Sequence, residues 1–173
     1  HMGQVLLHGP DAALKLEALV PAALTQLPEG KARYTFFTNH EGGIMDDLIV
    51  ANAGDHLFVV VNASMRAQDI PYMAASLKGI DVTEIFDRAL VAVQGPSAEA
   101  VVSAHCPQAA EMGFMETLEA LIDGSLCRLS RLGYTGEDGY EISIPEADAE
   151  RIARLMLGHP DCEPAGLGAR DSL

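Results

Sequence analysis

The sequence predicts an α+β fold in which antiparallel sheets are flanked by helices. Short apolar segments rich in Val, Ile, Phe and Tyr follow one another through tight turns, which is typical of β-hairpins. Between them lie segments with an apolar residue every three or four positions, which is typical of amphipathic helices. Strands joined directly by hairpins pair antiparallel, whereas parallel strands need a longer crossover connection.

The first half of the chain contains four strand segments and two helical segments. Pro10 suits the first turn of a helix, because a missing N–H costs nothing there. Residues 53–55 (Ala-Gly-Asp) form a turn between two apolar segments, which indicates a hairpin. Pro71 interrupts the second helix or starts its second part. We expect strands over residues 3–8, 32–39, 42–52 and 56–64, and helices over residues 10–19 and 65–78.

The second half continues in the same way. Ile152, Leu155 and Met156 lie on one face of a helix that ends at Gly158. Residues 114–133 fit either two strands or a helix-turn-strand unit. We expect a strand over residues 89–93, helices over 97–106 and 146–158, and a hairpin over 134–145. The last five residues are good helix formers without a C-cap, so we expect a piece of a longer protein, incomplete at both ends.

Composition and charge exclude several classes of function. The chain has 173 residues, of which 49% are hydrophobic, and a formal net charge of −14. Its 11 Lys and Arg residues form no run, so we expect no nucleic-acid or membrane partner. The three cysteines and six histidines are scattered without the spacing of metal ligands, so we expect no metal. No signal peptide or membrane-spanning run is visible, which favours a cytoplasmic location.

Acidic residues on strands are the candidates for chemistry. Asp46 and Asp47 interrupt the apolar strand segment GGIMDDLIV, and alternation places their side chains on opposite faces. Either both are held by backbone N–H groups near the turn, or one faces a functional cleft. Alternation places Glu141 opposite the apolar residues of GYEISIP, which by itself predicts a solvated position. Arg170 is either a surface helix residue or an anion clamp.

A functional carboxylate has two kinds of chemistry open to it in such a chain. It accepts two N–H donors at once, which suits a cyclic amidine or a 2-amino-4-oxo ring. Near an amine nucleophile it orients the amine or takes its proton. The residue pattern alone does not choose between these roles.

Several stretches together resemble one family. YTFFTNHEGGIMDDLIV, VVVNAS, VAVQGPSA, SRLGYTGEDGYEISIP and GLGARDSL are similar, in this order, to the glycine cleavage system T-protein, the aminomethyltransferase. HMGQVLLHGPDAALKLEALVP also resembles its N-terminal part. The resemblance implies that residues 1–30 are part of a first lobe and residues 31–86 an inserted α/β lobe carrying GGIMDDLIV. Residues 87–173 would continue the first lobe with GYTGEDGYEI, and a C-terminal β-barrel domain would be absent.

The resemblance also implies a reaction and a set of site residues. The family transfers a methylene unit from the aminomethyl-lipoyl arm of H-protein to tetrahydrofolate, its co-substrate, and ammonia is released. Asp47 matches the catalytic acid near the folate N10 atom, and Glu141 matches the residue that grips the pterin N–H groups. The other matching folate-site positions are Tyr34, Asn62, Tyr134 and Arg170.

Two alternatives accompany this interpretation. The chain could be the folate-binding module of a related demethylase or of a sarcosine or dimethylglycine dehydrogenase. It could also be a structural piece that binds nothing without its missing parts. Strand edges exposed at the ends of a fragment would allow a fragment dimer.

Overall fold

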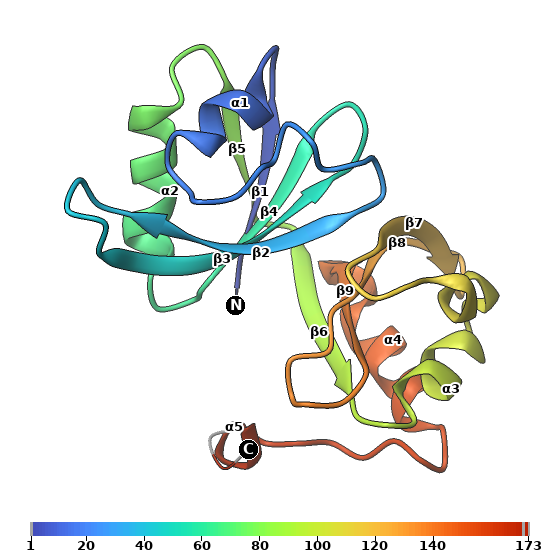
Figure 1. Ribbon diagram of the computed structural model, residues 1–173. Coiled ribbons are helices and arrows are strands. Elements are labelled where there is room, and N and C mark those ends of the chain that lie inside the picture. Colours follow the sequence, from blue (N-terminus) through green and yellow to red (C-terminus); the bar gives the residue numbers. More distant parts are fainter. Residues whose placement is uncertain (1, 171, 173) are drawn as a thin grey trace. The chain divides into compact units, whose positions relative to one another are not determined.

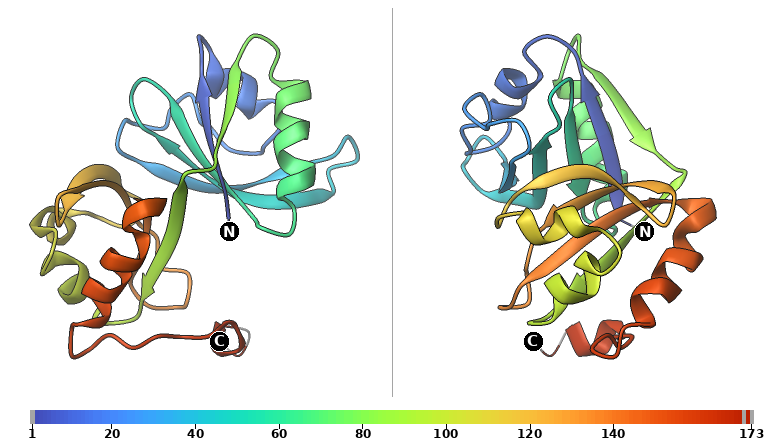
Figure 2. Two further views of the ribbon diagram at one scale, coloured as in Figure 1. Left: turned by 180° about the vertical axis from the view of Figure 1, so that it is seen from behind. Right: turned by 90° about the vertical axis from the view of Figure 1, so that its right-hand side faces the viewer.

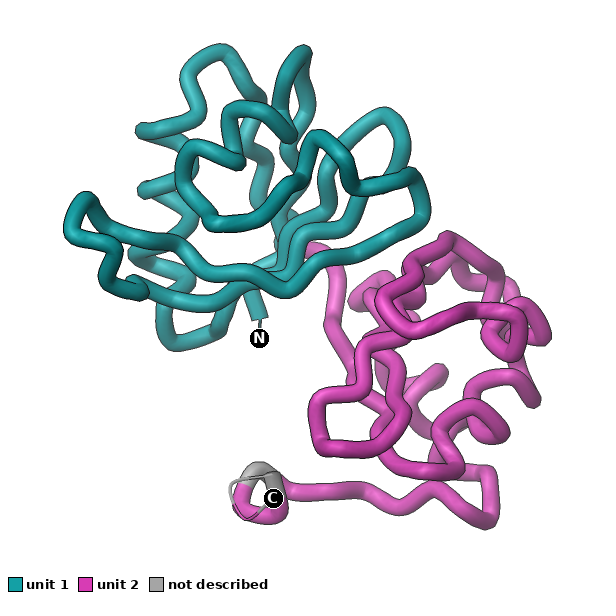
Figure 3. The backbone as a smooth tube through the Cα atoms, in the orientation of Figure 1, with its two compact units in different colours: residues 1–86 teal, residues 87–173 magenta. Residues whose placement is uncertain are grey.

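The computed structural model describes residues 2–170 and 172, and the chain forms two compact units. Residues 1–86 make up the first unit and residues 87–173 the second (Figure 3). Each unit has its own sheet and its own apolar core. The units are therefore described one at a time.

The first unit is a five-stranded sheet with two helices (Figure 1). Its strand order is β2-β3-β4-β1-β5, and every neighbouring pair is antiparallel. The strands are β1 (Gly3–His8), β2 (Ala32–Thr38), β3 (Ile44–Asn52), β4 (Leu57–Val61) and β5 (Asp81–Ile85), and the helices are α1 (Ala12–Glu17) and α2 (Arg66–Ser76). The central strand β4, LFVVV, is buried along its whole length, as its continuous apolar sequence predicts.

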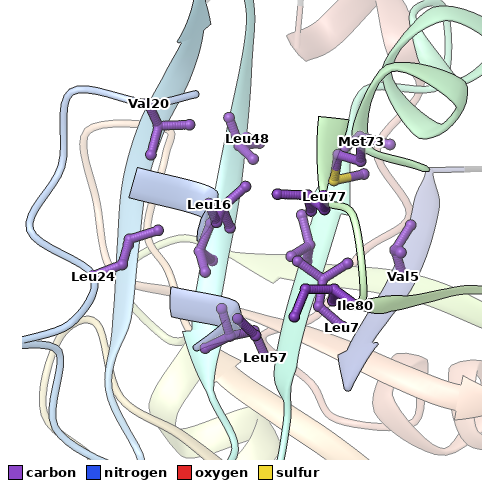
Figure 4. Close-up of a cluster of buried hydrophobic side chains, with 14 of the residues drawn as sticks. Val5, Leu7, Leu16, Val20, Leu24, Leu48, Leu57, Met73, Leu77 and Ile80 are labelled. Carbon is purple, nitrogen blue, oxygen red and sulfur yellow. The ribbon is translucent and has the colours of Figure 1, made fainter. Parts of the chain in front are cut away.

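Both helices of the first unit pack on one face of the sheet. Leu16 of α1 and Met73 of α2 belong to the same buried cluster as Val5 and Leu7 of β1. Figure 4 shows these side chains converging between the helices and the strands. Burying an aliphatic side chain of this size stabilises a fold by about 1.5–3 kcal/mol, so this cluster holds α2 firmly against the sheet.

The second unit is a four-stranded antiparallel sheet covered by helices on one face. Its strand order is β6-β9-β8-β7. Figure 2 shows α4 lying against β6 and β9. The elements are β6 (Arg88–Gln94), α3 (Ala98–Ser103), the 3-10 helix η1 (Pro107–Glu111), β7 (Thr117–Ile122), β8 (Ser125–Arg131), β9 (Gly139–Pro145), α4 (Glu146–Leu157) and α5 (Leu167–Arg170). Tyr140, Ile142 and Ile144 of β9 point into the core beneath α3 and α4.

The predicted fold class is confirmed, but several segments differ in detail from the prediction. Strand β5 was not predicted, and the expected hairpin over residues 134–145 is wrong, because residues 132–138 form a loop and only β9 follows it. The helix α2 runs without a break through Pro71, because Ile70, Met73 and Leu77 on its apolar side pack against the sheet. Residues 117–131 form two strands, not a helix-turn-strand unit. An Asp123-Gly124 turn with positive φ at both residues joins them, which is the geometry of a two-residue hairpin.

Candidate functional site

The two acids of GGIMDDLIV lie where strand β3 extends beyond its partner β4. The β3–β4 pairing begins at Leu48, opposite Val61, so Asp46 and Asp47 lie outside that ladder. A register shift between Phe37 and Thr38 adds an extra residue to β3 just before them. Such a bulge increases the local twist and changes the direction of nearby side chains. It therefore affects the directions in which Asp46 and Asp47 point.

Asp47 is a half-buried carboxylate held by two side-chain donors. The Tyr34 hydroxyl donates a hydrogen bond to Asp47 Oδ2 at 2.7 Å, and the Asn62 amide donates to Asp47 Oδ1. The hydrogen bond to the Asp47 carboxylate, with burial adding to it, raises the pKa of Tyr34 above its usual range. Tyr34 itself is 51% exposed, so this group of side chains reaches solvent. Three of the predicted site residues are therefore together in the first unit.

Asn62 connects Asp47 to its neighbour Asp46. The residue follows directly after β4, and its Nδ2 atom lies 3.2 Å from each carboxyl oxygen of Asp46. The same nitrogen lies 3.3 Å from the backbone oxygen of Asp47. Asp46 pairs opposite the core residue Phe37, so it lies on the face of the sheet that α2 covers, whereas Asp47 lies on the other face. The Asn62 amide at this strand end thus donates hydrogen bonds to both acids.

The structure adds an acid that the sequence analysis missed. Asp69 of α2 is 0% exposed and contacts Asp46. Burial, with the contact and charge of Asp46 second, raises the pKa of Asp69 to about 7. A signal for it exists in the sequence: Asp69, Met73 and Leu77 recur every fourth position, so an acid stands in the apolar stripe of an amphipathic helix.

Glu141 lies in the second unit, at the centre of its sheet. It is paired with Ala92 of β6 and Ser130 of β8, and its side chain is on the face opposite Tyr140 and Ile142. Alternation predicted this face correctly, but Glu141 is half-buried where the pattern alone predicted a solvated residue. Burial raises the pKa of Glu141 to about 7, so this carboxyl changes its charge near neutral pH.

Tyr134 lies in the loop of residues 132–138 that joins β8 to β9. Its side chain is half-exposed, and its backbone N–H donates to Gln94 Oε1 at 3.1 Å. Arg131 fixes the other end of the loop by donating two hydrogen bonds to Asp138, at 3.0 and 2.6 Å. The loop that precedes Glu141 is therefore anchored at both ends by side chains.

Gly133 makes a close approach in this loop that leads to a testable prediction. A Cβ atom at residue 133 would overlap the carbonyl oxygen of Glu137, which is backbone and cannot swing away. We expect Gly133→Ala to destabilise the second unit by about 1–3 kcal/mol, the usual cost of forcing extra atoms into a packed site. Chemical unfolding would measure this change. The control Gly166→Ala, with nothing near the added Cβ, should be close to neutral, and equal effects would contradict this packing.

Comparison with known proteins places the chain in a family. The family model of the GCVT N-terminal domain matches residues 1–173. The chain belongs to the GCVT N-terminal domain family. It is 40% identical to the mitochondrial aminomethyltransferase of Dictyostelium discoideum, covering all of this chain and 47% of that protein. It is 38% identical to the aminomethyltransferase of Rubrobacter xylanophilus, covering all of this chain and 47% of that protein.

A solved structure supports the same assignment of fold. The crystal structure of glycine cleavage system aminomethyltransferase T from Bartonella henselae matches this GCVT N-terminal domain with a TM-score of 0.91 and 35% identity. The match covers all of this chain and 48% of that chain. This domain thus spans about half the length of the relatives it matches.

The remaining predicted site residue is Arg170, at the end of α5. The backbone of Arg170 is helical, but its side chain lies outside the described part of the chain. Within residues 2–170 and 172, no three His, Cys, Asp or Glu side chains gather as metal ligands would. No helix in the described part is long and apolar enough to cross a bilayer.

Proposed function

We propose that this GCVT N-terminal domain is the folate-binding part of an aminomethyltransferase of the glycine cleavage system. The whole enzyme would transfer a methylene unit from the aminomethyl-lipoyl arm of H-protein to tetrahydrofolate and release ammonia. The observation that carries the proposal is the Asp47 carboxylate, held in place by Tyr34 and Asn62 at a solvent-reaching strand end. The names of the relatives support aminomethyl transfer in the glycine cleavage system. The Asp47 carboxylate supplies a group suited to that chemistry.

Asp47 would act on an amine of the folate. A carboxylate near an amine nucleophile orients the N–H and accepts its proton as the new C–N bond forms. Its two oxygens are each engaged by a donor, which fixes the direction of the carboxylate before a ligand arrives. A pre-positioned group of this kind costs no reorganisation during the reaction.

Glu141 would bind the pterin ring. An ionised carboxylate accepts a pair of N–H donors such as those on a 2-amino-4-oxo ring. A half-buried position suits this role, since hydrogen bonds to a charged group strengthen where water is excluded. Tyr134 and Arg170 are proposed as further folate contacts, and a cytoplasmic location remains part of the proposal.

The pH dependence of folate binding tests this assignment. Because the pKa of Glu141 is raised to about 7, the free protein must lose a proton from Glu141 before the carboxylate can bind the pterin. We expect the affinity of the chain for tetrahydrofolate to rise about tenfold from about pH 6 to about pH 8 and then to level off. Calorimetric titration over this range would measure the affinity.

Two variants test whether Glu141 causes the pH dependence of folate binding. Glu141→Gln should bind more weakly above neutral pH and lose the pH dependence, because an amide has no proton to release. The matched control is Glu137→Gln, an exposed acid four residues away, which should behave like the wild type. Folate binding that neither variant changes would place the pterin elsewhere. Absence of binding by a well-folded chain would leave the structural-piece alternative.

A further inference from the structure

Asp69 is the buried member of the group of side chains formed by Asp46, Asp47, Asn62 and Asp69, and the proposed transfer chemistry assigns it no role. Neither carboxyl oxygen of Asp69 has a hydrogen-bond donor among the described residues, and the side chain is 0% exposed. An ionised carboxylate in that position would lose its hydration without compensation. A buried acid in such a setting keeps its proton at a pH where an exposed acid has lost it.

The side chain that Asp69 contacts is a second carboxyl group. Two carboxyl groups in contact do not both ionise at low cost, so the pair holds one proton between them. Asp46 already accepts hydrogen bonds from the Asn62 amide, at 3.2 Å to each oxygen, which suits it to carry the negative charge. An O–H of Asp69 directed at Asp46 gives the buried group a partner and Asp46 a further donor.

We propose that Asp69 is a positioning residue that keeps its proton, donates a hydrogen bond to Asp46 and thereby fixes the position of Asn62. The Asn62 amide has two hydrogens and lies against acceptors of both acids, so its orientation depends on where Asp46 is held. Asn62 in turn holds Asp47. The consequence for transfer at Asp47 rests on the proposed function, but the arrangement of the four side chains does not.

The groups around Asp69 favour its protonated form. Burial has the largest effect on its pKa, and the contact and charge of Asp46 come next. Gln68 favours the charged form more weakly than these, and the charge of Asp47 raises the pKa by less than Gln68 lowers it. No cation appears among these influences. Arg66, three residues earlier in α2, is paired with Glu84 of β5. The other titratable groups on β1 and β5, which pack against α2, are His8 and Asp81. Strand β2, whose Phe37 packs on Tyr72 of α2, carries Arg33 and Tyr34.

Carbon-13 NMR of the aspartate carboxyl groups in this chain tests the arrangement without any ligand. One carboxyl group of the wild type should titrate near pH 7, and Asp69→Asn should abolish that titration. Asp46→Asn should lower the pKa of Asp69, because the neighbouring charge is replaced by an amide that can donate a hydrogen bond to Asp69. The exposed control Asp161→Asn should leave it in place. A wild type in which every aspartate titrates in the ordinary acidic range would overturn the proposal.

The titration of Tyr34 reports whether the arrangement reaches Asp47. Its pKa is raised by the hydrogen bond to Asp47, so a displaced Asp47 would let that pKa fall toward its ordinary value. We expect the raised pKa to persist in Asp69→Asn, whose amide still donates to Asp46. We expect it to fall in Asp69→Leu, which has a similar volume and no donor. An unchanged pKa of Tyr34 in a folded Asp69→Leu protein would disprove the coupling.

In the full-length protein the same variants separate this inference from the proposed function. Asp69→Leu should lower kcat roughly tenfold to a hundredfold with little change in the KM for tetrahydrofolate. The reason is that a displaced Asp47 would slow the transfer step more than it would weaken folate binding. Asp69→Asn should stay close to the wild type. If the chain shows the expected NMR titrations but no transferase activity or folate binding, the proposed function fails and the positioning role stands. If transfer proceeds but Asp69→Leu does not slow it, the positioning role fails.

Discussion

Replacing Asp47 by Asn in the full-length protein should lower the rate of methylene transfer about a hundredfold or more, while tetrahydrofolate affinity changes only a few-fold. Removing a positioned proton acceptor or a preorganised charge typically has a rate effect of this size. The asparagine has the same shape, and its oxygen and nitrogen can still meet the Asn62 amide and the Tyr34 hydroxyl respectively. The substitution thus removes the negative charge but leaves the side chain at residue 47 in the same position.

Single-turnover transfer from aminomethyl-loaded H-protein, beside a calorimetric folate titration, would separate the two quantities. Tyr34→Phe removes one of the two donors to Asp47 and leaves the carboxylate, so its rate loss should be smaller. Asp161→Asn changes an exposed acid in the other unit and should have no effect. Equal losses of rate and affinity in Asp47→Asn would make Asp47 a binding residue and refute its assignment as the proton acceptor.

The fold could be predicted largely from local patterns, because strands, turns and helices here obey short-range rules. The continuous apolar run of β4 and the amphipathic stripe of α4 are each visible in a few residues. The hairpin of β7 and β8 stayed ambiguous in the sequence analysis, although its Asp123-Gly124 turn has the residues that such a turn requires. The helix α2 continues through Pro71 because tertiary packing outweighs the local cost of proline.

The candidate site depends on contacts between distant segments, and local patterns contain little of that information. Asp47 and Asn62 meet because β3 extends beyond β4, which is a property of the strand register. Asp69 joins them only because α2 folds back over the same strand end. Alternation placed Glu141 on the correct face, but its burial depends on the surroundings of the folded chain. The roles assigned to Asp47, Asn62 and Glu141 came from family resemblance, not from pattern.

The largest effect on stability is expected at Arg131, which ties together three segments of the second unit. Besides its two bonds to Asp138, it donates to Glu99 of α3 at 2.6 Å and to the backbone oxygen of Met112 at 2.6 Å. Its guanidinium lies 5.3 Å from the ring centre of Tyr140. The Arg131 side chain is only 16% exposed, so its removal takes away hydrogen bonds that water replaces only in part. Asp138 would keep the backbone N–H of Gly139 as a donor.

We expect Arg131→Met to lower the free energy of unfolding of the second unit by about 2–3 kcal/mol. This value lies below the range for fully buried ion pairs, because Asp138 and Glu99 retain some contact with water. Arg151→Met is a matched control. Arg151 also has two acidic partners, Asp123 and Asp148, but it is 43% exposed, so its loss should lower the stability much less than the loss of Arg131.

The difference between wild type and Arg131→Met should also depend on pH in a defined direction. Arg131 holds the pKa of Asp138 below its usual range, so the stabilisation is present above the unfolded-state value of about 3.9 and is lost as the pH falls through the folded-state value. The stability difference should therefore shrink on acidification below about pH 4. Urea unfolding would measure it, and amide hydrogen exchange would locate it in β8 and β9. An equal loss in Arg151→Met, or lost protection confined to the first unit, would contradict the anchoring role of Arg131.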